Sequence, residues 1–104
     1  MAKSKWVLFG VYRLGSKEAE RRHAAITRYM PGRGQVRYPL SHKFTIEADS
    51  EAEALELGAR EWFGTVLPRL RSSRLLQVIE LAEQGDYSPS RWRIALGPQP
   101  ARRG

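Results

Sequence analysis

The chain has 104 residues and a formal net charge of +7, with 18 basic and 11 acidic side chains and no cysteine. This length suits one domain, and the lack of cysteine excludes disulfides, cysteine-ligated zinc and a thiol nucleophile. No run of about 18 apolar residues predicts a membrane span, and no signal-peptide pattern is evident, so we expect a cytoplasmic protein.

The charges are sorted into blocks of one sign. Residues 1–12 carry +2, residues 13–43 carry +6, residues 44–68 carry −5 and residues 69–104 carry +4. Such blocks create local fields that favour charged partners. Arginine outnumbers lysine fourteen to four. This excess suits bidentate contacts to phosphate or carboxylate, and it also follows from codon bias in a GC-rich genome.

The first expected element is a strand over residues 5–14, which are rich in aromatic and β-branched side chains and end at Gly15. Both faces of this strand are apolar, which predicts a central strand or one whose second face is covered by another element. Gly10 in its middle is typical of a bulge. One face holds Trp6, Leu8, Tyr12 and Leu14, and the other holds Val7, Phe9 and Val11.

A helix is predicted next over residues 16–30, with Ser16 as N-cap and glutamates in its first turn. Residues 31–41 carry Gly and Pro at both ends and indicate a loop or the tip of a β-ribbon. Residues 42–48 alternate as a strand does. The core face of that strand holds Phe44, Ile46 and Ala48.

The clearest element is a helix over residues 50–67, in which Ser50 and Glu53 fit a capping box and Pro68 provides the stop. Its apolar stripe is Ala52, Leu55, Ala59, Trp62, Phe63 and Val66. The outer face carries the acidic block, which is either a solvated helix face or a protein-docking surface. The candidates for such an interface are Glu53, Glu56 and Glu61.

Residues 74–83 fit both a helical and a strand period. We favour the strand, because residues 91–96 offer a hairpin partner with Trp92, Ile94 and Leu96 pointing inward. The sequence therefore predicts a single small α+β domain over residues 1–96, with about four antiparallel or mixed strands and two helices packed on one face. Residues 97–104 have the composition of a disordered basic tail.

Catalytic and metal-binding patterns are sparse. His23 and His42 do not have the HxH or HExxH spacing of a metal site, and neither has a visible partner that would orient it as a general base. The segment Gly32–Gly34 lacks a phosphate-loop pattern. We expect no enzymatic activity, no cofactor, no metal and no small-molecule substrate. A small nuclease-like hydrolase that uses one of the histidines is the residual alternative.

Two basic surfaces favour a non-enzymatic module that binds DNA or RNA. An arginine-rich loop suits a groove or unpaired bases, and a basic sheet face opposite the helices suits a phosphate backbone. The candidate residues are Arg21, Arg28, Arg33, Arg37, Tyr38, Lys43, Arg91 and Arg93. The alternative is an adaptor, assembly factor or inhibitor of the kind that phages and mobile elements encode, which docks by charge on a protein partner or a second copy.

Overall fold

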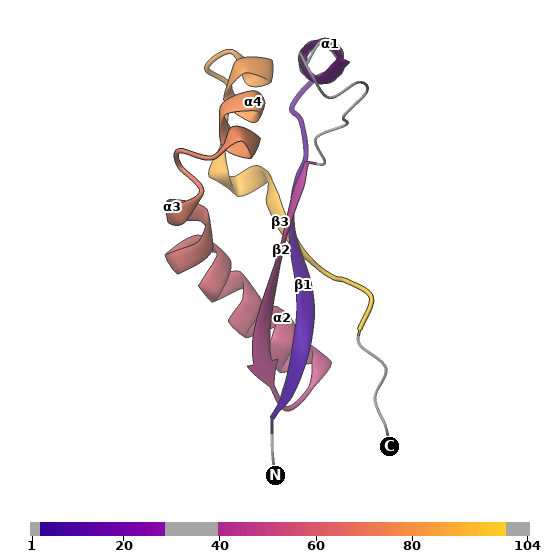
Figure 1. Cartoon of the computed structure of the whole chain (residues 1–104), viewed down its shortest axis with the longest axis vertical. Coiled ribbons are helices and arrows are strands. Elements are labelled where there is room, and N and C mark those ends of the chain that lie inside the picture. Colours follow the sequence, from indigo (N-terminus) through magenta and orange to yellow (C-terminus); the bar gives the residue numbers. More distant parts are fainter. Residues whose placement is uncertain (1–2, 29–39, 100–104) are drawn as a thin grey trace.

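The fold is a three-stranded antiparallel sheet with helices beside it and at one end (Figure 1). A computed structural model describes residues 3–28 and 40–99. The strand β1 (Ser4–Tyr12) lies between β2 (Ser41–Ala48) and β3 (Trp92–Leu96) and is antiparallel to both. The predicted α+β class is confirmed, but the described part of the chain contains three strands rather than about four.

The strand predicted over residues 74–83 is wrong, because this segment is the helix α4 (Arg74–Glu83). Ser73 caps it, with its hydroxyl accepting a hydrogen bond from the Leu76 N–H. Leu76 and Ile79 are both buried in one cluster. Helical spacing places two residues three positions apart on one face, whereas a strand would direct them to opposite faces.

The first helix begins where predicted. Its N-cap is Ser16, whose hydroxyl accepts a hydrogen bond from the Ala19 N–H at the start of α1 (Lys17–Arg28). This helix packs mainly against α4, and Arg22 Nε donates to the Ala82 carbonyl at 2.7 Å. The sheet is covered by α2 (Glu51–Glu61) instead, which contacts all three strands. Two helices side by side on the sheet are therefore not observed, because the apolar stripe of α1 is met by α4.

The second helix passes the predicted stop. After α2, a π-helical turn η1 (Trp62–Val66) leads into the short helix α3 (Leu67–Arg69), which contains Pro68. In η1 the Leu67 N–H bonds to the Trp62 carbonyl five residues back. This wider turn admits a proline, which in a regular helix crowds the carbonyl four residues back. The predicted apolar stripe is partly wrong, because Ala52 is exposed and Phe63 is 45% exposed, whereas the buried residues of α2 are Ala54 and Gly58.

The core centres on Trp62, which is fully buried and packs against Trp92 with ring centroids 4.8 Å apart. Gly10 leaves the space for this ring, since a Cβ there would lie 2.5 Å from three indole atoms. The β1–β2 register runs through Gly10 without a break, so the predicted bulge is absent. The predicted inward residues Phe44, Ile46, Ala48, Trp92, Ile94 and Leu96 are buried or half-buried on the α2 side of the sheet. Trp6, Leu8 and Tyr12 of β1 are buried on the same side.

The short 3₁₀ helix η2 (Pro89–Arg91) precedes β3. After β3, the chain continues along β1. The Gly97 N–H donates to the Val7 carbonyl at 2.9 Å, and the Gln99 side chain bonds both the N–H and the carbonyl of Val7 at 3.0 Å. Residues 97–99, which we expected in the tail, therefore lie against the sheet, and residues 100–104 lie outside the described part. None of the described helices has the length and apolar character that crossing a bilayer requires.

Candidate nucleic-acid interface

The face of the sheet opposite α2 is not covered by any described helix. Side chains alternate along β1, so the face that does not contact α2 carries the second apolar set of that strand. We call this surface the outer sheet face. It is formed by Lys5, Val7, Phe9 and Val11 of β1, by Lys43, Thr45 and Glu47 of β2, and by Arg93 and Ala95 of β3.

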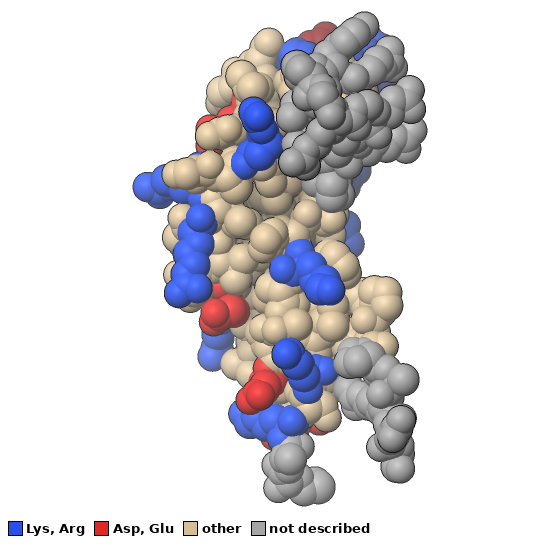
Figure 2. Space-filling view, viewed as in Figure 1, with Lys and Arg blue, Asp and Glu red and all other residues tan. Residues whose placement is uncertain are grey.

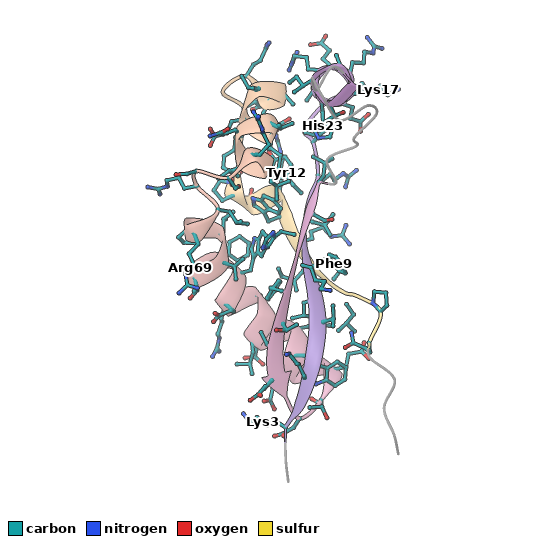
Figure 3. All side chains as sticks on the ribbon, viewed as in Figure 1. Lys3, Phe9, Tyr12, Lys17, His23 and Arg69 are labelled. Atoms are coloured by element: carbon teal, nitrogen blue, oxygen red, sulfur yellow. The ribbon has the colours of Figure 1, made fainter. Side chains whose placement is uncertain are left out.

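Phe9 lies at the centre of the outer sheet face. It is opposite Lys43 on one side and Ala95 on the other, and the next row places Val11 opposite Arg93. Directly opposite residues have Cβ atoms about 4.5–5.5 Å apart, so the ring and the lysine are neighbours. Phe9 and Val7 are half-buried and Val11 is 37% exposed. In Figure 3, Phe9 projects from one side of the strands, whereas Arg69 of the helical layer lies on the other.

The outer sheet face is basic. Lys5, Lys43 and Arg93 are exposed on it, and Glu47 is its one acidic residue among those described. Lys43 and Arg93 form no ion pair with any described residue. Figure 2 shows basic side chains spread along the length of the visible surface, with acidic ones interspersed. The result is an apolar row flanked by Lys43 and Arg93, which have no ion-pair partner within residues 3–28 and 40–99.

A hollow opens at the α1 end of this row. Its walls combine apolar side chains of Val11, Leu14 and Leu40 with the guanidinium-bearing residues Arg13 and Arg93. Glu20 of α1 lies at the same hollow. The hollow continues the row of Val7, Phe9 and Val11, so an extended ligand lying along β1 would reach it.

The predicted nucleic-acid-binding residues are only partly brought together. Lys43 and Arg93 share the outer sheet face, and Arg21 is exposed on α1. The backbone of Arg28 ends α1, but its side chain lies outside the described part of the chain. Arg33, Arg37 and Tyr38 also lie outside the described residues, so the arginine-rich loop stays a prediction.

Arg91 is engaged in the protein interior. Its Nη1 pairs with Glu83 Oε2 and donates to the Asp86 carbonyl at 2.9 Å. Glu83 has a side chain only 1% exposed, and it also accepts hydrogen bonds from the Tyr12 hydroxyl at 2.8 Å and the Gly15 N–H at 3.1 Å. Burial and the bond to Glu83 raise the pKa of Tyr12, which lies between β1 and α4 in Figure 3. Arg91, the last residue of η2, is thus paired with α4 through Glu83 and does not lie on β3 beside Arg93 as predicted.

The acidic candidates on α2 are partly neutralised. Glu53 Oε1 lies 3.6 Å from Lys3 Nζ, and Glu56 accepts a hydrogen bond from Arg60 at 3.1 Å. Glu61 is exposed and lines a shallow groove between α2 and the edge of β2. The acidic block is therefore mixed in sign along this helix.

The two histidines lie on different elements, α1 and β2. His23 of α1 is half-buried, its Nε2 has no hydrogen-bond partner among the described residues, and burial lowers its pKa. His42 is the second residue of β2, and its ring centroid lies 6.1 Å from that of Trp62. Within residues 3–28 and 40–99, no group of three or more metal-ligating side chains is placed to hold a metal ion.

Sequence reasoning missed Phe9, Val7 and Val11 as site residues. Their apolar face predicts either a central strand or one covered on its second face, and β1 is the central strand. The signal that distinguishes Phe9 and Val11 is a cation directly opposite each on a neighbouring strand, Lys43 for Phe9 and Arg93 for Val11, which depends on the strand order. Comparison with known proteins adds no relative: no family model, no curated protein and no solved structure matches the chain.

Proposed function

We propose that the protein binds single-stranded nucleic acid on the outer sheet face. The observation that carries this proposal is Phe9, a half-buried ring at the centre of the face with Lys43 directly beside it and Arg93 in the adjacent row. An aromatic side chain on an open sheet stacks on a base, and cations around it contact the phosphates.

A single strand fits this surface better than a duplex does. The middle of the face is apolar, formed by Val7, Phe9 and Val11, and the cations stand to its sides. A duplex presents charged phosphates to a flat surface and keeps its bases stacked inside, whereas unpaired bases can be splayed onto a ring. The hollow beside Arg13 and Arg93 extends the same path and suits a further nucleotide.

The protein-docking alternative, based on Glu53, Glu56 and Glu61, has less to recommend it. Two of these three carboxylates already face a cation of the same chain. Exposed pairs of this kind leave a surface of mixed sign with little net field. The outer sheet face has an aromatic ring beside cations that no described carboxylate pairs with, so it is the stronger candidate.

The test is fluorescence anisotropy with labelled DNA and RNA single strands of about 12 nucleotides, and with a matched duplex. Loss of one base-stacking ring costs about 1–3 kcal/mol, so Phe9→Ala should weaken single-strand binding roughly 5- to 150-fold. Phe63→Ala is the control, because this ring is exposed but lies in η1, away from the outer sheet face. The Phe63→Ala variant should bind single strands with the affinity of the wild type.

Salt dependence gives a second readout. If Lys5, Lys43 and Arg93 each neutralise one phosphate, log K should fall with log salt with a slope of about −2 on a single strand. Arg93→Ala should reduce the slope by about 0.7, and Arg69→Ala on α3 should leave it unchanged. Absence of binding at low salt, or equal affinity of Phe9→Ala and the wild type, would overturn the proposal.

A further inference from the structure

Among the described strands, β2 is an edge of the sheet, and half of its backbone groups point away from β1. The Tyr12 N–H bonds to the Leu40 carbonyl at 2.8 Å, which marks these two as a hydrogen-bonded pair. Hydrogen-bonded and non-hydrogen-bonded pairs alternate along an antiparallel ladder. The same register therefore directs the backbone of every second β2 residue toward β1 and that of the residues between toward the open edge. The residues that face the open edge are Ser41, Lys43, Thr45 and Glu47.

This edge is better suited to pairing than the opposite one. β2 has eight residues without Gly or Pro, whereas β3 has five and is followed by Gly97 and Pro98. Unpaired N–H and C=O groups on a regular edge are a template for another strand, and proline blunts an edge because it lacks the N–H. The long regular edge is therefore β2.

In the register centred on Thr45, the charges on the edge of one copy complement those of a second copy. Pairing two β2 strands antiparallel about a two-fold axis at Thr45 places residues with outward-facing backbone groups opposite each other. Lys43 then lies opposite the partner's Glu47, and Glu47 opposite the partner's Lys43. Cross-strand pairs of opposite charge stabilise a sheet, and like charges directly opposite destabilise it. Moving the axis to residue 43 or 47 would instead place lysine against lysine or glutamate against glutamate.

The groove beside the edge is also self-complementary. Between β2 and α2, the half-buried side chains of Ile46 and Leu57 adjoin the exposed residues Arg60 and Glu61, which have opposite charges. The two-fold axis that pairs the β2 strands brings the same groove of the partner alongside. Each copy thus offers apolar area and both signs of charge at the same border.

We propose that the chain forms a two-fold dimer in which two β2 strands pair antiparallel about Thr45 and join the two sheets into one of six strands. The inference is independent of nucleic-acid binding. It commits to a second copy as the occupant of the edge, because the alternation of Lys43 and Glu47 about Thr45 complements itself.

Charge reversal tests the register. Sedimentation velocity on nuclease-treated protein at about 1–200 µM should show a concentration-dependent dimer. Lys43→Glu and Glu47→Lys each place like charges opposite each other at two symmetric positions, so each should raise the dimer dissociation constant at least about tenfold. The double variant K43E/E47K restores the opposite-charge pairs and should dimerise as the wild type does. Arg71→Glu, exposed before α4, is the control for a change in net charge.

A cysteine cross-link locates the axis, since the chain has no cysteine of its own. Residues opposite each other in a hydrogen-bonded antiparallel pair have Cα atoms about 5.5 Å apart, which a disulfide can bridge. Thr45→Cys should form a covalent dimer on mild oxidation. Ser41→Cys should not, because the two copies of residue 41 would be separated by roughly 27 Å along the paired strands.

Three results would overturn this proposal. A monomer at every concentration would do so, and so would a dimer whose dissociation constant is unchanged in both single charge reversals. Equal cross-linking at positions 41 and 45 would do so as well, because it would indicate random collisions rather than a register. Circular dichroism of each variant shows whether it is folded, and the double variant separates a lost register from a lost fold.

Discussion

The close approach of Gly10 and Trp62 gives the most direct test of the core. A Cβ at position 10 would lie 2.5 Å from Cε2, Cζ2 and Cη2 of the indole, whereas carbon atoms in contact prefer about 3.5–4.0 Å. The ring would have to move by about 1 Å. It is fully buried and packs against Trp92 and Phe44, with centroid distances of 4.8 and 5.6 Å. The displacement must therefore pass to its neighbours.

Forcing one extra carbon into a packed core costs about 1–3 kcal/mol, and replacing glycine within a strand recovers part of this through backbone entropy. We expect Gly10→Ala to lower the free energy of unfolding by about 2 kcal/mol, which corresponds to roughly 10 °C in melting temperature for a domain of this size. Urea denaturation and thermal melting, both followed by circular dichroism, measure these quantities.

The matched control is Gly64→Ala. A Cβ at Gly64 meets no atom within 4 Å, and this residue lies within η1. The substitution should therefore leave stability unchanged or raise it by up to about 1 kcal/mol. The double variant G10A/W62F should recover stability relative to W62F alone, because a smaller ring leaves room for the added methyl group. Equal stability of Gly10→Ala and the wild type would refute this account of the packing.

Two further predictions concern buried polar groups. Glu83→Ala removes the partner of Arg91, Tyr12 and the Gly15 N–H at once. We therefore expect the free energy of unfolding, measured by urea denaturation, to fall by about 3 kcal/mol. The exposed Glu80→Ala should lower it by less than about 0.5 kcal/mol. Burial lowers the pKa of His23 below its ordinary value of 6.5. The unfolded chain therefore takes up a proton that the folded chain does not, and the free energy of unfolding falls as the pH drops below about 6.5. His23→Gln should make the urea midpoint fall less between pH 7.5 and 5, and an identical fall in both proteins would contradict this.

The elements that sequence predicted well are those whose signals are local. Ser16 and Ser50 cap the helices they were expected to cap, and the alternation in residues 42–48 reports the faces of β2 correctly. Residues 74–83 were misjudged because the choice between two periods depends on the distant cluster that Leu76 and Ile79 join. Propensity and spacing contain no information on that cluster.

The candidate site divides in the same way. Alternation alone placed Lys43 and Arg93 on one face, and the structure has them there. The place of Phe9 between them needs the order of the strands, and the capture of Arg91 by Glu83 needs the docking of α4 beside β1. Both are tertiary facts, and neither follows from residue type or spacing.

The two proposed surfaces use different groups and can coexist. Pairing of β2 strands uses backbone N–H and C=O groups in the plane of the sheet, whereas nucleic-acid binding uses side chains that stand out of that plane. Lys43 alone has both roles, because it lies beside Phe9 and also faces the partner's Glu47 in the dimer. The variant K43E/E47K therefore keeps the dimer but places a carboxylate beside the stacking ring, where it repels phosphate. Dimerisation with loss of binding in this one protein would indicate two separate surfaces that meet at residue 43.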